Sequence, residues 1–100
     1  MNENQKAKCT EIAEHYGKRK QKMQAMQEMT ELILLLTQRQ DQKKDRGEYI
    51  SNMIDEMSDT LIMIEQLRQL YMISEFEIRQ RIDFKLNRQL ERIQSEQEGN

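Results

Sequence analysis

Two pairs of acidic residues have a spacing that places both members of each pair on one face of a helix. Glu28 and Glu31 lie three residues apart, and so do Glu56 and Asp59. Three residues correspond to about 4.5 Å along a helix axis, so the two carboxylates of a pair are neighbours. If the two helices pack antiparallel through their apolar sides, all four carboxylates can converge, and we expect them to form a metal site.

These four acidic residues have no Lys or Arg four positions before or after them, whereas Glu65 and Arg68 elsewhere in the chain are spaced to form an ion pair. Each acidic pair therefore repels itself, at a cost of roughly 0.2–0.5 kcal/mol. Apolar neighbours such as Met29 and Met57 flank the pairs, and partly buried carboxylates need a compensating charge. Oxygen ligands without His or Cys favour Mg²⁺, or Mn²⁺. The alternative is an ordinary solvated acidic face.

The apolar spacing predicts an all-α protein, and the absence of Pro together with only three Gly agrees with this class. Helices are expected over residues 3–16, 19–39, 48–71 and from about 75 onward. Ser74 and Glu77 have the capping-box spacing that begins the last of these helices. A four-helix bundle is the architecture that we expect from this pattern.

A chain of 100 residues is expected to form a single domain, 1–100, with a core that spans about 12–93. Residues 40–47 are charged, lack apolar side chains and close on Gly47, which predicts the main loop. The polar tail 94–100 is expected to fray.

The apolar surface of the two acidic helices exceeds what so short a chain can cover. Residues 32–36 and 61–64 make their helices apolar nearly all the way round. A helix of this kind must be buried on several sides. We therefore expect a second copy of the chain to cover it, in a homodimer or a homotetramer.

Composition excludes several other classes of protein. The net charge of −2 argues against nucleic-acid binding, and no apolar run is long enough to cross a membrane. The N-terminus is polar and lacks the pattern of a secretory signal. The single Cys9 excludes a disulfide framework and suits a reducing compartment. These features predict a cytoplasmic protein.

The acidic pairs and their surroundings resemble the MazG-like, all-α nucleotide pyrophosphohydrolases. The hallmark of that family is E-x-x-E followed by E-x-x-D, which here are Glu28 to Glu31 and Glu56 to Asp59 with 24 residues between them. Three stretches are similar to the family: HYGKRKQKMQAMQEMTELI, DEMSDTLIMIEQL and FKLNRQLERI. The resemblance covers about residues 12–93. The chain departs from the family at Gln27, where many members have Glu, and at Lys22, near which they often have Gln.

The resemblance implies a four-helix fold that assembles as a dimer or a dimer of dimers. It implies hydrolysis of a nucleoside triphosphate between the α and β phosphorus atoms, which gives a monophosphate and pyrophosphate. Mg²⁺ would be held by Glu28, Glu31, Glu56 and Asp59, and one of these four would act as the general base. The resemblance does not indicate which of them does so.

Other residues are candidates for contact with the substrate. Lys85 and Arg88 belong to a basic row on the last helix and are candidate contacts for the pyrophosphate, with plain surface charges as the alternative. Tyr16 is expected to be a core residue and His15 an exposed one, and contact with the base is the alternative for both. The scarcity of aromatic residues favours a pyrimidine deoxynucleotide such as dUTP or dCTP.

Two rival interpretations remain open. A non-catalytic helical oligomerisation or adaptor module would explain the surplus of apolar residues without any chemistry. The same fold could also act on phosphoribosyl-ATP, as relatives in the histidine pathway do.

Overall fold

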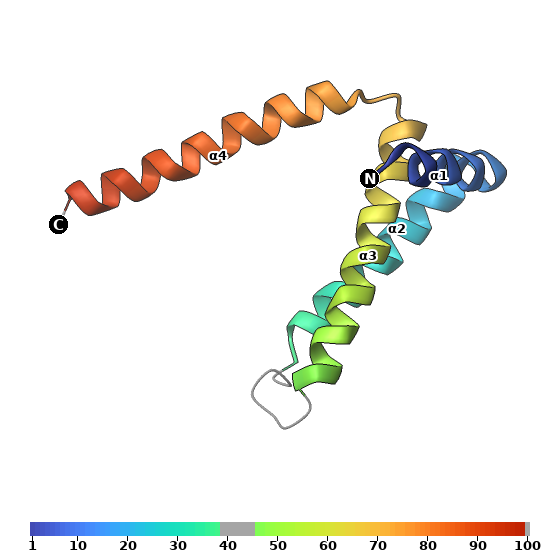
Figure 1. Cartoon of the computed structure of the whole chain (residues 1–100), viewed down its shortest axis with the longest axis horizontal. Coiled ribbons are helices and arrows are strands. Elements are labelled where there is room, and N and C mark those ends of the chain that lie inside the picture. Colours follow the sequence, from blue (N-terminus) through green and yellow to red (C-terminus); the bar gives the residue numbers. More distant parts are fainter. Residues whose placement is uncertain (39–45, 100) are drawn as a thin grey trace.

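The computed structural model describes residues 1–38 and 46–99, and every regular element in this part of the chain is an α-helix. The four helices are α1 (Glu3–Tyr16), α2 (Lys18–Leu36), α3 (Arg46–Leu70) and α4 (Glu75–Glu98). Figure 1 shows their order along the chain. The all-α class and the four expected helices are confirmed.

Capping residues explain where three of these helices begin or end. The Asn2 side chain accepts a hydrogen bond from the Gln5 amide at 2.8 Å, and the Gln5 side chain accepts one from the Asn2 amide at 3.0 Å. Gly17 separates α1 from α2 with φ 86°, a backbone conformation that only glycine adopts without strain. Ser74 and Glu77 form the expected capping box at the start of α4.

The ends of the helices differ from the sequence-based expectation at three places. Helix α3 begins at Arg46, so Gly47 lies inside the helix and does not close the loop. A glycine costs only about 1 kcal/mol in a helix, which a long amphipathic segment tolerates. Helix α4 continues to Glu98 and so includes most of the tail for which fraying is expected, and the Gln and Glu residues there favour a helix. Helix α2 ends at Leu36, and residues 40–45 of the expected loop lie outside the described residues.

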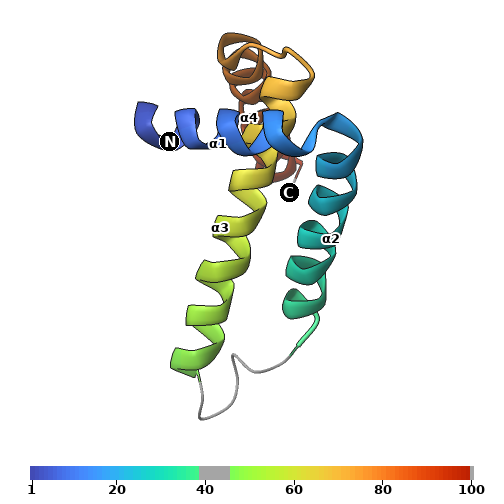
Figure 2. The ribbon, with the colours of Figure 1, turned by 90° about the vertical axis from the view of Figure 1, so that its right-hand side faces the viewer.

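Helices α2 and α3 lie side by side in antiparallel orientation, and α1 lies across the end where α2 begins and α3 ends (Figure 2). The core between them is small. Its buried apolar members are Cys9, Ala13, Ala25, Leu35, Tyr49 and Met63. Two buried amides join this core, because Gln21 Nε2 donates to Gln66 Oε1 at 2.7 Å.

Helix α4 leaves the other three helices and extends away from them (Figure 1). The radius of gyration is 17.4 Å, whereas a compact domain of this length has about 13 Å. A single chain therefore does not close the expected four-helix bundle. None of the helices in the described part of the chain is long and apolar enough to cross a membrane.

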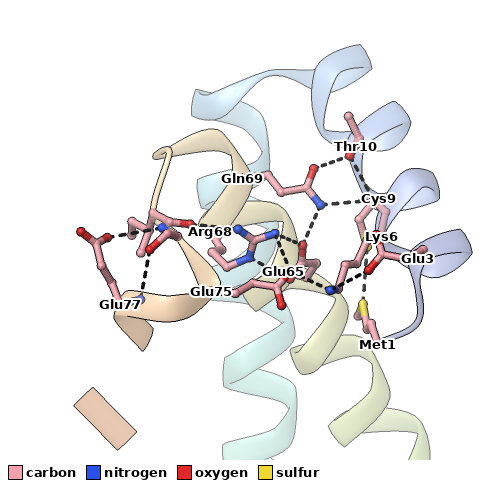
Figure 3. A network of polar contacts seen from close by, with 12 residues as sticks. Met1, Glu3, Lys6, Cys9, Thr10, Glu65, Arg68, Gln69, Glu75 and Glu77 are labelled. Atoms are coloured by element: carbon pink, nitrogen blue, oxygen red, sulfur yellow. Dashed lines mark hydrogen bonds and ion pairs between the residues drawn. The ribbon is translucent and has the colours of Figure 1, made fainter. Parts of the chain in front are cut away.

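A network of polar contacts fixes the direction in which α4 departs (Figure 3). Arg68 forms an ion pair with Glu65, as their spacing predicts, and also donates to the Ile73 carbonyl at 2.9 Å. Glu75, the first residue of α4, pairs with Lys6 of α1 at 2.7 Å and lies 3.7 Å from Arg68. These contacts connect α1, the end of α3 and the start of α4.

Candidate metal centre

The antiparallel packing of α2 and α3 brings the two acidic pairs together. Carboxylate oxygens of Glu28, Glu31 and Glu56 all lie within 4.8 Å of one another. Asp59 is not part of this group of three. It lies one helical turn after Glu56 on α3 and interacts with Glu28 of α2. The convergence that the spacing predicts is therefore present, with three carboxylates close together and the fourth beside them. We call these four residues the acidic cluster.

The electrostatics of the acidic cluster are unfavourable. Among the ion pairs of residues 1–38 and 46–99, none includes a member of the cluster. Burial raises the pKa of Glu56, and the charges of Glu31 and Asp59 raise this pKa further. Burial also raises the pKa of Asp59, as do the charge of Glu28 and a hydrogen bond shared with it. Both shifts show that negative charge is costly here.

Two oxygens of the cluster have no hydrogen-bond donor among residues 1–38 and 46–99. Glu28 Oε2 and Glu56 Oε2 are shielded from solvent and accept no hydrogen bond from a described residue. The other oxygen of Glu28 accepts a hydrogen bond from Gln24 Nε2 at 2.8 Å. A shielded carboxylate oxygen without a donor is unfavourable, and a bound cation would remove this cost. The ligand set, which consists only of oxygens, fits Mg²⁺ or Mn²⁺.

A cavity of about 410 Å³ adjoins the cluster on the side away from α1. Besides Glu31 and Glu56, its lining includes Glu48 and Asn52 of α3, which the sequence reasoning missed. Their spacing in the sequence could have located them, because they precede Glu56 by eight and four positions and therefore share its helix face.

The basic residues are not brought to the cluster within one chain. Lys85 and Arg88 lie on α4, which extends away from α2 and α3 (Figure 1). The Arg88 guanidinium lies 5.7 Å from the centre of the Phe84 ring on its own helix. His15 is exposed as expected. Tyr16 was expected in the core, but its side chain is 48% exposed, because α1 lies across the end of the helix pair and leaves this edge open.

The chain was compared with protein-family models, with curated proteins and with solved structures, and none of the three comparisons found a match.

Proposed function

We propose that this protein is a Mg²⁺-dependent nucleotide pyrophosphohydrolase that cleaves a nucleoside triphosphate to a monophosphate and pyrophosphate. The observation that carries the proposal is the group of three carboxylates within 4.8 Å, two of which contribute a shielded oxygen with no donor in the described part of the chain. The resemblance of the two acidic motifs to the MazG-like family supports the same reaction.

The four acidic residues have two tasks in this proposal, which are binding of the cation and removal of a proton from the attacking water. Glu28, Glu31 and Glu56 hold the cation, with Asp59 as the fourth ligand beside Glu28. A bound Mg²⁺ would neutralise phosphate oxygens and lower the pKa of a coordinated water. One of the four carboxylates accepts the proton of the attacking water. Gln24 holds the Glu28 carboxylate in place through its hydrogen bond of 2.8 Å.

Self-association is part of the proposal. Large apolar side chains remain exposed on all four helices, among them Ile33, Leu34, Leu61, Leu86 and Leu90. The accessible surface is 8350 Å². A compact monomer of this mass exposes about 6000 Å², so the excess is about 2300 Å². A stable interface buries about 800 Å² on each partner. The excess is therefore sufficient for an extensive interface between copies of this chain.

The same assembly would complete the site. Because α4 extends away from its own acidic cluster, Lys85 and Arg88 can approach a cluster only if α4 packs on another copy. A triphosphate carries more negative charge than bound cations alone neutralise, and these two side chains would contact its β and γ groups. The proposed site is thus shared between a cluster from one chain and a basic row from its partner.

The reaction is tested by assaying nucleotides for release of pyrophosphate in the presence of Mg²⁺. The panel includes dUTP, dCTP, the purine triphosphates and phosphoribosyl-ATP. We expect EDTA to abolish the release and Glu56→Gln to lower it at least about 100-fold, since a metal ligand is lost. Asp55→Asn is the matched control, because Asp55 is an exposed acidic neighbour outside the cluster. Release of orthophosphate in place of pyrophosphate would show that a different bond is cleaved.

A non-catalytic oligomerisation module is the second candidate, and the exposed apolar side chains favour it. It predicts that Mg²⁺ leaves the thermal stability unchanged. The proposed enzyme predicts that Mg²⁺ raises it, since a ligand that binds only the folded state stabilises that state.

A further inference from the structure

The pair of helices α2 and α3 has two open sides, and the acidic cluster lies on one of them. The positions at which the two helices face each other recur every seven residues. They are Gln21, Glu28, Leu35, Tyr49, Glu56 and Met63. Residues three positions later lie about 60° round the helix towards one side, and residues one position later lie about 100° towards the other. Glu31 and Asp59 are three positions later, so the first of these sides is that of the acidic cluster.

The opposite side of the helix pair is apolar and exposed. Leu36, Ile50, Met57 and Ile64 each come one position after a residue that faces the other helix. Two further side chains lie three or four residues from these and therefore share their side of the helix. We call the six residues of this side the back face, and their side chains are 39–59% exposed: Ile33, Leu36, Ile50, Ile54, Met57 and Ile64.

The back face carries no charge. Segments 29–36 and 50–64, which contain it, have four charged residues, which are Glu31, Asp55, Glu56 and Asp59. Three of these belong to the acidic cluster, and the charge of Asp55 raises the pKa values of Glu56 and Asp59, so it also acts on the acidic side. Two-fold symmetry places the same surface patch of both subunits in contact. An uncharged patch can meet its own copy without repulsion.

Helix α4 adds a second apolar surface at the end of the back face. Ile64 lines a cavity of about 290 Å³ together with Ile78 and Ile82 of α4. The polar network of Figure 3 lines the rest of this cavity, with Met1 and Arg79. Helix α4 has 24 residues and is therefore about 36 Å long, whereas packed helices lie about 8–10 Å apart. It is long enough to extend past a second pair of helices that packs on the back face.

We propose that the back face is a two-fold interface on which a second copy of this chain packs. The helix pairs of the two copies form one four-helix bundle, and the two acidic clusters face outward on opposite sides of it. This inference rests on the self-association that is part of the proposed function and specifies the surface that mediates it. It does not depend on the proposed reaction.

The exposed area is sufficient for this interface. The chain exposes 8350 Å², which is about 2300 Å² more than a compact monomer of its mass, whereas a stable interface buries about 800 Å² on each partner. The occupant follows from the absence of charge on the back face. A partner with charged groups would leave them unpaired there at a high cost, but a second copy brings the same uncharged side chains.

The test compares two exposed apolar side chains on opposite sides of the helix pair. Met57 of the back face is 50% exposed, and Leu34 is 57% exposed but lines the cavity beside Glu31 and Glu56. Sedimentation of the full chain at micromolar concentration measures its association. We expect Met57→Lys to weaken the association of the wild type at least about 100-fold, because it places an unpaired charge in the interface. Leu34→Lys should leave the association unchanged.

Cysteine labelling provides a second measurement if circular dichroism shows that Met57→Lys does not fold. Met57→Cys and Leu34→Cys are treated with a maleimide, and the native Cys9 is buried. In the associated protein, Met57→Cys should react much more slowly than Leu34→Cys. The same reaction in urea, where neither thiol is covered, corrects for differences in intrinsic reactivity.

The outcomes separate this inference from the proposed reaction. A monomeric wild type, an association that Met57→Lys leaves intact or Leu34→Lys disrupts, or equal labelling of the two cysteines would overturn the interface, even if the wild type releases pyrophosphate. An association that only Met57→Lys disrupts, in a protein that releases no pyrophosphate from any nucleotide of the panel, would support the interface and refute the reaction.

Discussion

Glu28 and Glu56 each place one carboxylate oxygen where neither solvent nor a donor from the described residues reaches it. Glu31 and Asp59 add further negative charge around them. Isolated acidic residues on a helix surface avoid this situation, because solvent or a cation four residues away compensates the charge. In the absence of a cation, the acidic cluster therefore destabilises the fold that contains it.

This repulsion leads to a prediction for Glu56→Gln. Because burial and neighbouring carboxylates raise the pKa of Glu56, the charged form is the unfavourable one, and its removal should raise the melting temperature at pH 7 in EDTA. Mg²⁺ should then raise the melting temperature of the wild type but not that of the variant. Thermal melting followed by circular dichroism measures both effects.

Asp55→Asn removes a charge from the next residue and serves as the control. It should keep the response to Mg²⁺. A variant Glu56→Gln that melts at a lower temperature in EDTA and still responds to Mg²⁺ would show that the cluster is not a cation site.

The residues of the acidic cluster could be predicted from the sequence, and the spacing of Glu48 and Asn52 to Glu56 could have located these two as well, but the pairing of Gln21 with Gln66 could not be predicted. The spacing within one helix fixes which of its side chains are neighbours, so the two acidic pairs were evident. Gln21 and Gln66 meet only through the antiparallel register of α2 and α3. Residues so far apart in the chain have no local signal for their contact, and each alone is an ordinary helix residue.

The helices themselves were predicted with nearly correct bounds, because apolar spacing and capping residues are local signals. Ser74 and Glu77 show this most clearly, since their spacing alone located the start of α4. The position of α4 was not predicted. It depends on the contacts of Arg68 and Glu75 with other elements, which join residues of α1, α3 and α4.

The pair of Glu65 and Arg68 gives α3 a stability that depends on pH. The hydrogen bond from Arg68 lowers the pKa of Glu65 below its ordinary value. The pair therefore stabilises the fold above the unfolded-state pKa of about 4.3, and this contribution is lost as the pH falls through the lower folded-state pKa. Glu65→Gln should cost about 1–3 kcal/mol at pH 7, and this difference from the wild type should shrink as the pH falls. Denaturant unfolding of both proteins from pH 7 to pH 3 measures this difference in the free energy of unfolding.

Glu11→Gln is the control for this series, since Glu11 is exposed on α1 and forms none of these contacts. Glu56 and Asp59 change the stability in the opposite direction. Because their pKa values are raised in the folded state, their protonation increases the free energy of unfolding as the pH falls. The comparison of Glu65→Gln with the wild type cancels that effect. A difference that stays constant from pH 7 to pH 3 would contradict the assigned role of the pair.

Packing of α4 on a second copy of the chain would explain both its extended position and the large exposed apolar surface. An isolated chain would leave Leu86, Leu90 and Ile93 of α4 in solvent. Helix α4, which also carries Lys85 and Arg88, extends away from α2 and α3 (Figure 1). Packing of α4 on a second copy would cover these side chains and deliver Lys85 and Arg88 to the phosphates. Assembly and catalysis would then depend on the same helix.

Complementation between two defective chains tests this sharing of the site. Glu56→Gln damages the acidic cluster, whereas Lys85→Ala with Arg88→Ala damages only the phosphate contacts. Below the KM of the wild type, each variant alone should be nearly inactive. When the two are unfolded and refolded together, a symmetric dimer should regain about a quarter of the wild-type rate, because hybrid dimers contain one intact site. No recovery in verified hybrids would show that both sets of residues act within one chain.

Direct binding of Mn²⁺, followed by electron paramagnetic resonance, tests the central claim that the acidic cluster is a site for a divalent cation. Mn²⁺ accepts the same oxygen ligands as Mg²⁺ and its free ion is detected directly. We expect the wild type and Asp55→Asn both to bind Mn²⁺ at a saturable site, because Asp55 adds charge near the cluster but is not one of its members. Glu31→Gln and Glu56→Gln should lose this site while they retain their helical content. Equal saturable binding of Mn²⁺ by Glu56→Gln and the wild type would contradict the account.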